Sequence, residues 1–500
     1  MSEISQAKED QMKSSAEYDI IIIGAGAVGC AVARELSRYK VRTVVLEKDS
    51  DVAGETSGRN SAVVHSGIYS KPGTKMAKFC VEGNRSFEKL CADLHVPYRK
   101  TGKLIVASDR EDEEGVIELY EQGMSNGCEN LRIIGGEEAG RLVNGLECTL
   151  ALFSPETAIT NPFLYCVALA ENAHENGVDF VFDCKVNSIE KNEGWFLVKT
   201  GREDFEVYRS KIIVNCAGLR ADEISSMAAG TNYRIYPCRG EYYILDEDIT
   251  GILPMPVYPA PRKGIGGLGV HVTPTAEGNV IIGPSAVYID SKDDYSVTEN
   301  VLDNLLAEAF ELIPELKSLK PIGNYSGIRP KMTAPDEGGY DDFIIEEDEL
   351  VPGLFNMIGI ESPGLTASVP AAKYMAGLIG SKLRLQVKDI WKSKRDGIVT
   401  FRDKTIEEQV ALISADPEYG EISCCCRKIT RGEIRRAIEN PLGVRSLSGI
   451  KYRAWPMTGR CSGGYCLPKI TEMLIKDYGM KPNEINYRDV GSGMFTGEVK

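Results

Sequence analysis

The sequence predicts an α/β protein with an inserted antiparallel β-sheet domain (α+β) and a small C-terminal α-helical module. Three observations support this fold class: a strand, glycine turn and helix near the start, a stretch rich in β-branched and aromatic residues over 233–289, and a group of cysteines near the end. At 500 residues, of which 43% are hydrophobic, the chain is long enough for about three domains with a buried core.

The spacing of apolar residues and the positions of Gly and Pro predict the helices and strands. Tyr18–Gly29 is a predicted strand running into a glycine turn, Ala31–Tyr39 a helix and Arg42–Glu47 a second strand, which together make a βαβ unit. Further helices are expected at 113–127, 162–177, 297–313, 365–383 and 406–415, and strands at 180–186, 195–200, 211–216 and 353–360. The β-rich stretch 233–289 predicts an antiparallel sheet that covers the substrate.

The net charge argues against two kinds of partner. Lys+Arg 58 against Asp+Glu 73 gives −15, so we expect no non-specific binding to nucleic acid or to an anionic membrane. The longest apolar run, 20–33, is too short for an integral membrane segment, and the polar stretch 1–19 lacks the apolar core of a signal peptide. The expected location is cytoplasmic.

A nucleotide site is predicted at the first glycine turn. Gly24 makes the tight turn, Gly26 lets the backbone approach a pyrophosphate, and Gly29 packs the helix on the strand. Glu47 ends the next strand, 18 residues past Gly29, where it can hold ribose hydroxyls. This pattern alone fits FAD and NAD equally.

Two later segments favour FAD. The apolar strand 212–216 leads into Ala217 and Gly218, as expected of a strand that returns beside the nucleotide. Residues 352–366 form a strand, a glycine-rich turn and a helix start, and the turn would aim helix amides at the pyrimidine edge of a flavin. The cofactor-binding positions predicted in this turn are Gly359, Gly364, Leu365 and Thr366.

The chain resembles the FAD-dependent oxidoreductases of the D-amino-acid oxidase type, and within them the L-2-hydroxyglutarate dehydrogenases and the anaerobic-type glycerol-3-phosphate dehydrogenases. The resemblance rests on 57–84 (SGRNSAVVHSGIYSKPGTKMAKFCVEGN), 269–286 (GVHVTPTAEGNVIIGPSA), 325–330 (YSGIRP) and 360–366 (IESPGLT). It adds Ser57 and Asn60 to the expected cofactor-binding residues.

The resemblance also implies the domain organisation of 17–385. An FAD-binding Rossmann-like domain is expected from 17–90, 150–225 and 325–385, and a substrate-covering sheet from 90–150 and 226–324. Residues 386–420 are charged and weakly patterned, which indicates a linker, followed by a cysteine module over 421–480 and a C-terminal tail over 481–500.

Oxidation of a secondary alcohol by a flavin needs a base for the hydroxyl proton, hydride transfer to flavin N5, and a cation that fixes the substrate's anionic group. Of the four histidines, His271 and His65 lie in the family-specific segments. His271 is the preferred base, and His65 is the second candidate or a residue that positions the flavin. Arg329 is the candidate anion clamp, since a guanidinium grips carboxylate or phosphate at two points.

Three further cations are weaker candidates for holding a second anionic group of the substrate: Lys331, Arg59 and Arg239. Clamping cations suit a hydroxy acid and a polyol phosphate alike. The substrate class expected from the sequence is therefore a small anionic secondary alcohol, such as L-2-hydroxyglutarate or sn-glycerol 3-phosphate.

The cysteines near the end form a separate group. Nine of the 14 cysteines are scattered over 30–238 in apolar contexts, whereas five lie between Cys424 and Cys466. The spacing is Cys424-Cys425-Cys426, 34 residues, then Cys461 and Cys466. Ten Lys/Arg against three Asp/Glu over 421–470 give a local charge of +7. Two close thiol pairs of this kind can surround a metal centre.

This module resembles the [2Fe-2S] domain of bacterioferritin-associated ferredoxin, over about 422–475 and above all in GRCSGGYC at 459–466. The resemblance implies Cys424, Cys426, Cys461 and Cys466 as ligands of a [2Fe-2S] cluster. Because a third cysteine, Cys425, stands between the first two ligands, it can also replace a neighbour. A zinc site is the alternative, since four thiolates also bind zinc.

The two modules together indicate an FAD-dependent dehydrogenase that passes electrons through a [2Fe-2S] cluster to a partner protein. The resemblance implies that this partner is a second flavoprotein or another electron-acceptor subunit. Two alternatives remain open: an amino- or imino-acid dehydrogenase on the same fold, which would need no histidine base, and a non-catalytic iron–sulfur protein with a redox or iron-handling role.

Overall fold

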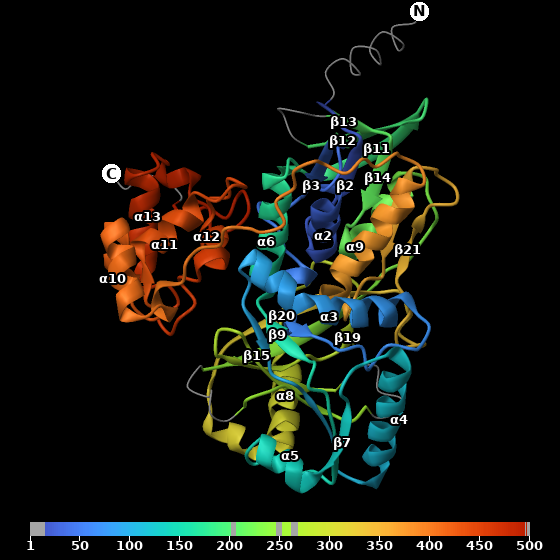
Figure 1. The fold of residues 1–500 in the computed structure, drawn as a ribbon, viewed down its shortest axis with the longest axis vertical. Coiled ribbons are helices and arrows are strands. Elements are labelled where there is room, and N and C mark those ends of the chain that lie inside the picture. Colours follow the sequence, from blue (N-terminus) through green and yellow to red (C-terminus); the bar gives the residue numbers. More distant parts are fainter. Residues whose placement is uncertain (1–15, 202–206, 247–252, 262–268, 496, 498–500) are drawn as a thin grey trace, which may run out of the picture.

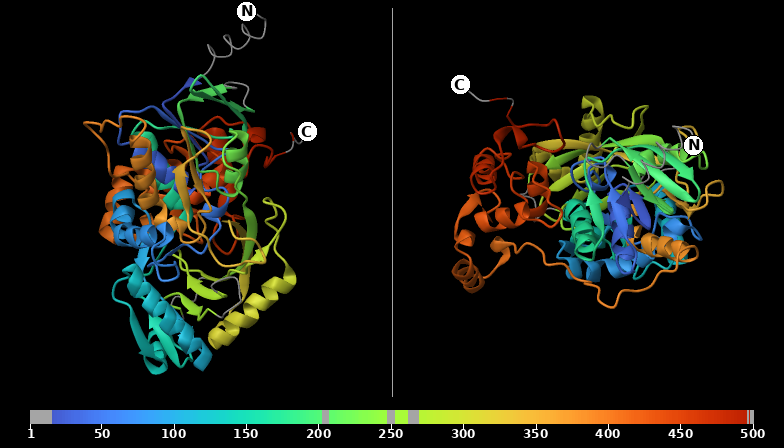
Figure 2. Two further views of the ribbon diagram at one scale, coloured as in Figure 1. Left: turned by 90° about the vertical axis from the view of Figure 1, so that its right-hand side faces the viewer. Right: turned by 90° about the horizontal axis from the view of Figure 1, so that it is seen from above.

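The computed structural model describes residues 16–201, 207–246, 253–261, 269–495 and 497. Most of the polar N-terminal stretch and the last residues of the expected tail lie outside these ranges. The chain forms a nucleotide-binding domain around a parallel sheet, a second sheet domain beside it, and a helical C-terminal module that lies against the first domain (Figures 1 and 2). No helix among the described residues is long and apolar enough to cross a membrane.

A six-stranded sheet forms the centre of the nucleotide-binding domain. Its order is β10 (Asp179–Val181), β3 (Thr43–Leu46), β2 (Ile20–Ile23), β14 (Ile212–Asn215), β22 (Leu354–Ile358) and β21 (Ile344–Glu347). All neighbours are parallel except β21, which pairs antiparallel with β22. The central strands are apolar runs because both faces of the sheet are covered.

Alternate residues of β2 face different layers. Ile20 and Ile22 pack in one core cluster with the helices α2 (Ala27–Leu36), α6 (Pro162–Glu175), α9 (Gly364–Gly380) and α3 (Lys75–Leu94). Ile21 and Ile23 pack in another, with α7 (Ala221–Met227) and a sheet of order β1 (Ala16–Glu17), β13 (Val207–Ser210), β12 (Trp195–Thr200) and β11 (Val186–Asn192). No helix was expected over 75–94, although Thr74 caps α3 by accepting from the amide of Ala77.

The antiparallel sheet expected over 233–289 is confirmed, and it is larger than predicted. Its order is β19 (Val287–Tyr288), β15 (Tyr236–Leu245), β18 (Val280–Gly283), β17 (His271–Pro274), β16 (Val257–Pro259), β6 (Leu104–Ala107), β8 (Leu150–Phe153) and β7 (Arg132–Gly135), with β20 (Pro321–Lys331) also on β15. Its one parallel pair among the described residues joins β16 to β6. The helices of this domain are α4 (Arg110–Asn126), α5 (Gly136–Leu142) and α8 (Glu299–Leu312).

A small sheet includes part of the family-specific segment 57–84. It contains β4 (Val63–Val64), β9 (Ala158–Thr160) and β5 (Tyr98–Lys100). Between β3 and β4 lies the 3-10 turn η1 (Thr56–Gly58), which is held to the larger sheet by a hydrogen bond from the Thr56 hydroxyl to the carbonyl of Ile328.

The C-terminal module has its own core. It contains β23 (Ile422–Cys424), β24 (Ile429–Thr430), α11 (Arg431–Ile438), α12 (Leu447–Ala454) and α13 (Cys466–Lys476), and it is preceded by α10 (Ile406–Ala415) at the predicted residues. The core residues include Ile434, Leu447, Ile470 and Leu474. Ile485, from the segment expected to be a tail, is fully buried in the same core.

The segment 386–395, expected to belong to a linker, is bound to the nucleotide-binding domain in the structure. Arg34 of α2 donates to the carbonyl of Ser393 at 2.9 Å, and the side chain of Asn172 on α6 donates to the carbonyl of Lys392 at 3.1 Å. Arg395 pairs with Glu171 of α6 at 2.6 Å, with both side chains buried. We call residues 386–395 the strap.

Candidate active site

The glycine turn between β2 and α2 is shaped for a ligand. Gly24 has φ +101°, and a Cβ at Gly29 would collide with the carbonyl oxygen of Gly24. A Cβ at Gly26 would lie 2.9 Å from the hydroxyl of Ser57, which accepts from the first amide of α2 at 2.9 Å. These residues line a cavity of about 150 Å³, which can hold the nucleotide part of a cofactor.

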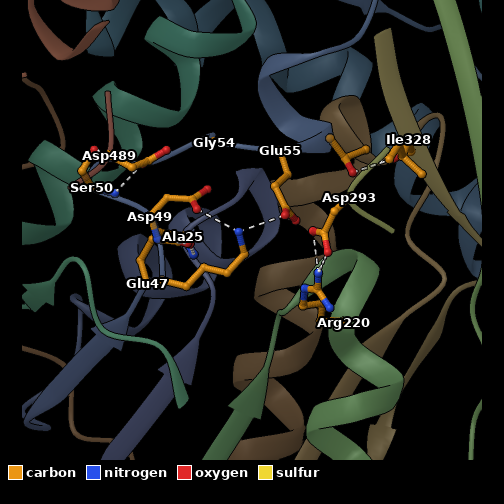
Figure 3. Close-up of polar contacts among 12 residues, drawn as sticks. Ala25, Glu47, Asp49, Ser50, Gly54, Glu55, Arg220, Asp293, Ile328 and Asp489 are labelled. Atoms are coloured by element: carbon orange, nitrogen blue, oxygen red, sulfur yellow. Dashed lines mark hydrogen bonds and ion pairs between the residues drawn. The ribbon is translucent and has the colours of Figure 1, made fainter. Parts of the chain in front are cut away.

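Glu47 closes the base of this cavity at the end of β3. Its carboxylate accepts from the amide of Ala25 at 2.6 Å and from the amide of Asp49 at 3.0 Å, as Figure 3 shows. Burial raises the pKa of Glu47 to about 7. The carboxylate is thus fixed next to the glycine turn, in the place expected for a residue that binds ribose hydroxyls.

Of the other predicted nucleotide residues, Ala217 and Gly218 lie at the same cavity and Asn60 at an adjoining one. Ala217 and Gly218 follow β14, and Gly218 has φ +54°. Asn60 braces the loop after η1, because its side-chain amide donates to the carbonyls of Thr56 at 3.2 Å and Ser57 at 2.8 Å.

The turn after β22 lies at a second, adjoining cavity of about 420 Å³. Gly364 and Leu365 line this cavity, and Gly359 has φ +70°. The hydroxyl of Thr366 accepts from the amide of His65 at 3.0 Å, which ties the start of α9 to the loop before α3. Both cavities are lined by Val28, Thr56 and Ser57. One extended ligand can therefore occupy both.

The second cavity brings His271, His65 and Arg329 together, although they lie far apart in the sequence. His271, on β17, lies 2.8 Å from the hydroxyl of Thr273 through Nδ1, and its ring stacks on Tyr258 at 4.0 Å. Burial lowers the pKa of His271 well below its ordinary value. The ring is therefore neutral at pH 7, the form that can accept a proton.

His65 enters the cavity from the loop between β4 and α3. Its Nε2 lies 3.4 Å from the hydroxyl of Ser362, and burial, with a smaller contribution from Lys103, lowers its pKa to about 3. His65 is thus also neutral, and it is anchored to the turn that precedes α9.

Arg329 is a half-buried cation of this cavity that forms no ion pair among the described residues. Its two terminal nitrogens donate to the carbonyl of Ser285 at 3.2 and 3.1 Å. Lys331 pairs with Glu361 at 3.1 Å, and Arg239 pairs with Glu241 at 3.0 Å and lies outside the cavity lining. Arg59 lines the cavity and lies over the ring of Tyr295 at 4.5 Å. An anionic substrate group therefore finds Arg329 without a competing carboxylate.

A buried lysine that sequence reasoning missed lies behind the histidines. Lys103 is 1% exposed, and its ammonium lies 4.5 Å from the ring centre of Tyr69 and 4.6 Å from that of Tyr258. Burial lowers the pKa of Lys103 to about 7. The available signal was a single lysine at the head of the apolar strand Leu104–Ala107.

The four predicted metal ligands stand as two pairs. The sulfurs of Cys426 and Cys461 are 3.5 Å apart, and a hydrogen bond from Cys466 lowers the pKa of Cys424 to about 6. Cys425 is exposed and belongs to neither pair. Within the described residues, no three His, Cys, Asp or Glu side chains are grouped closely enough to hold a single metal ion.

Backbone amides surround these sulfurs. The backbone of Met457 acts to lower the pKa values of Cys424 and Cys466, and the backbone of Tyr465 and Gly463 lowers the pKa of Cys461. Amide donors stabilise thiolates and the sulfurs of an anionic cluster. Two thiol pairs with this donor set fit a two-iron cluster.

A dinucleotide that extends through both cavities would reach from the glycine turn to the histidines, as in a flavin-dependent oxidoreductase. The chain belongs to the FAD dependent oxidoreductase family, which matches residues 19–378. Residues 422–476 match the BFD-like [2Fe-2S] binding domain, as the cysteine spacing indicated. The predicted family, fold class and cofactors, FAD and a [2Fe-2S] cluster, are thereby confirmed.

Two curated relatives differ in how much of the chain they cover. The glycerol 3-phosphate dehydrogenase of Caloramator mitchellensis is 35% identical over 486 residues, 97% of this chain and 99% of that protein. The mitochondrial L-2-hydroxyglutarate dehydrogenase of Arabidopsis thaliana is 35% identical over 407 residues, 72% of this chain and 82% of that protein.

Solved structures match the flavin part. The L-alpha-glycerophosphate oxidase of Mycoplasma pneumoniae, with FAD bound, has a TM-score of 0.70 and 28% identity, and the match covers 76% of this chain and 98% of that one. The glycine oxidase of Geobacillus kaustophilus, at 19% identity and a TM-score of 0.65 over 73% of this chain and 95% of its own, shares the fold.

Proposed function

We propose that this chain is a dehydrogenase for sn-glycerol 3-phosphate that passes electrons from FAD through its [2Fe-2S] cluster to a partner protein. The observation that supports this substrate is the relative from Caloramator mitchellensis, which is similar over both the flavin and the cysteine parts. A CH–OH donor also suits a cavity with two neutral histidines and an arginine without a carboxylate partner.

The residues take the following roles in this proposal. When bound, FAD supplies a two-electron acceptor and the cluster a one-electron carrier. His271 takes the proton of the substrate hydroxyl, with its ring oriented by Thr273 and Tyr258. His65 holds the alcohol or the flavin edge from the opposite segment of the cavity, and Arg329 binds the phosphate by two parallel hydrogen bonds.

L-2-hydroxyglutarate is the second candidate substrate. The Arabidopsis thaliana relative is as similar to the flavin part as the first relative is to the whole chain. Both compounds are small secondary alcohols with an anionic group that Arg329 can bind. The first relative covers 97% of the chain and therefore nearly all of the cysteine module, whereas the second covers 72% of the chain, and this difference favours the first candidate.

The proposed exit for electrons is the surface of the cysteine module. Cys426 and Cys461 are exposed, whereas Cys424 and Cys466 are buried. A cluster held by these four thiols would therefore have one edge near solvent, where an acceptor subunit can approach. We infer that the acceptor is a second flavoprotein or another electron-carrying subunit.

The deciding experiment is an anaerobic visible spectrum of the purified protein with glycerol 3-phosphate and L-2-hydroxyglutarate in separate cuvettes. Bleaching of the flavin and cluster bands by glycerol 3-phosphate alone is the expected result. Bleaching by L-2-hydroxyglutarate alone would show that L-2-hydroxyglutarate, and not glycerol 3-phosphate, is the substrate. Bleaching by neither compound, or full activity of a variant with both His271→Ala and His65→Ala, would favour an imino-acid dehydrogenase.

The phosphate site is tested separately by Arg329→Gln. We expect the variant to retain bound FAD, because Arg329 lies outside the cavity that holds the nucleotide part of the cofactor. We also expect KM for glycerol 3-phosphate to rise by about 10- to 100-fold, as for a lost charge-assisted pair. An unchanged KM would show that another cation holds the phosphate.

A further inference from the structure

The module is fixed against the flavin domain by buried polar contacts. Arg453 of α12, with a side chain 1% exposed, pairs with Asp51 at 2.6 Å and with Glu171 at 3.1 Å. Arg427, beside the ligand Cys426, donates to the carbonyl of Glu277 at 3.4 Å in the hairpin between β17 and β18. In Figure 1, α12 accordingly lies next to α6. The two redox modules therefore have one defined relative position.

Aromatic rings fill the interface at this point. Phe163, in the first turn of α6, stacks face to face on Tyr452 of α12, with ring centres 3.9 Å apart and planes at 6°. Trp455, at the end of α12, lies 6.5 Å from Phe163. The indole N–H of Trp455 is buried and has no hydrogen-bond partner among the described residues.

The rings connect the two cofactor sites. On the flavin side, a Cβ at Gly58 would collide with the ring of Phe163, and Gly58 ends η1, whose Thr56 and Ser57 line both cofactor cavities. On the cluster side, Trp455 is two residues from Met457, which packs in the module core with Cys424 and Cys466. Each step of this route is a packed contact or a short piece of backbone.

We infer that Phe163, Tyr452 and Trp455, the aromatic bridge, form the electron route between the flavin and the cluster. The inference rests on the proposed function. Electron transfer is faster through close-packed atoms than through water-filled gaps, and the bridge fills the interface without being oxidised itself. Substrate oxidation leaves two electrons on the flavin, and these cross singly. Each reduces one ferric ion to ferrous, and a one-electron acceptor such as ferricyanide then removes it.

The test separates flavin reduction from cluster reduction. Phe163→Leu holoenzyme is mixed anaerobically with glycerol 3-phosphate, and flavin absorbance and the EPR signal of the reduced cluster are followed on rapidly frozen samples. Flavin bleaching should stay within about twofold of the parent, because the ring lies outside both cavity linings, whereas cluster reduction should slow at least 10-fold. Phe180→Leu, which changes an aromatic residue on β10, is the matched control and should alter neither rate.

Further measurements exclude a purely structural effect. Tyr452→Phe keeps the stacked ring and should keep the cluster rate. Hydrogen exchange of α12 reports whether the module stays docked. If Phe163→Leu loosens the docking, Trp455→Leu, which changes the ring on the cluster side, allows the same comparison of flavin reduction with cluster reduction. As a readout without substrate, the flavin is photoreduced and its re-equilibration with the cluster is timed. Unchanged cluster reduction in docked leucine variants would overturn the route. A parent cluster that substrate never reduces would overturn the proposed function instead.

Discussion

The two histidines of the candidate site are in the protonation state that a catalytic base needs. His271 and His65 are both buried and neutral, and a neutral imidazole can take the substrate proton without first losing one. These two histidines and Arg329 could be selected from sequence because they stand in specific motifs. Lys103 could not, since Tyr69 and Tyr258, which enclose its ammonium, come from distant segments that only the fold brings together.

We expect His271→Asn to lower kcat for glycerol 3-phosphate by about 10²–10⁴-fold, the usual contribution of a positioned base. The asparagine retains hydrogen bonding but cannot take the proton. Bound FAD should be retained, because His271 does not line the cavity that holds the nucleotide part of the cofactor. The measurement is stopped-flow flavin bleaching, with His174→Gln on α6 as the control. Equal rates in His271→Asn and the parent would remove His271 from the mechanism.

Lys103→Met should stabilise the protein and change its pH profile. The pKa of Lys103 is lowered to about 7 in the folded state, so burying its charge is unfavourable below pH 7, and the parent gains stability as pH rises from about 7 towards the ordinary pKa of lysine. The variant lacks this cost and should be about 1–3 kcal/mol more stable at pH 6 in urea unfolding, with a smaller gain at pH 9.

Lys103→Met should also reduce activity at low pH, although it stabilises the protein there. Lys103 contributes to the lowered pKa of His271, so its removal raises that pKa. A base must be unprotonated, and the acid limb of kcat/KM should therefore move to higher pH. An acid limb that stays in place, with stability unchanged at pH 6, would show that the pKa of Lys103 is not lowered in the folded enzyme and that its charge does not act on His271.

Elements were predictable where a local pattern determines them. The glycine turn, the central strands and α10 match their expected positions, because runs of apolar residues and capping residues in the sequence mark where these elements begin and end. The helix α3 was missed although Met76, Phe79, Phe87 and Leu94 bury one face at helical spacing. The strap and the packing of Ile485 could not be predicted, since their partners on α6 and in the module core are distant in sequence.

At the scale of elements, Arg453 of α12 supplies the buried ion pairs that join α12 to Asp51 and to Glu171 of α6. Arg453→Met leaves Asp51 buried without its cation, and we expect a loss of about 3–5 kcal/mol. Urea unfolding and hydrogen exchange of α12 measure it. Lys476→Met, which breaks an ion pair with side chains 70% and 58% exposed, is the control and should change stability by less than about 0.5 kcal/mol. Equal effects in the two variants would mean that the buried pair does not hold the module.

The whole molecule combines a flavin fold shared with an oxidase and a module that the oxidase match does not cover. We expect this combination to favour one-electron acceptors over oxygen. Turnover with ferricyanide should exceed hydrogen peroxide formation in air by at least about 10-fold, and Cys461→Ser should lower the first rate while leaving substrate bleaching of the flavin intact. Peroxide formed as fast as substrate is consumed would contradict electron export.

The strap has a consequence for how such a protein can change during evolution. Glu171 on α6 holds Arg395 from the strap and Arg453 from the module, and all three side chains are buried. A stop codon after residue 385 would remove both cations of this carboxylate, together with the strap and the module that cover it. The face of α6 that carries Glu171 would then be uncovered. A descendant that retains only the flavin half is therefore expected to have changed the residues of this face.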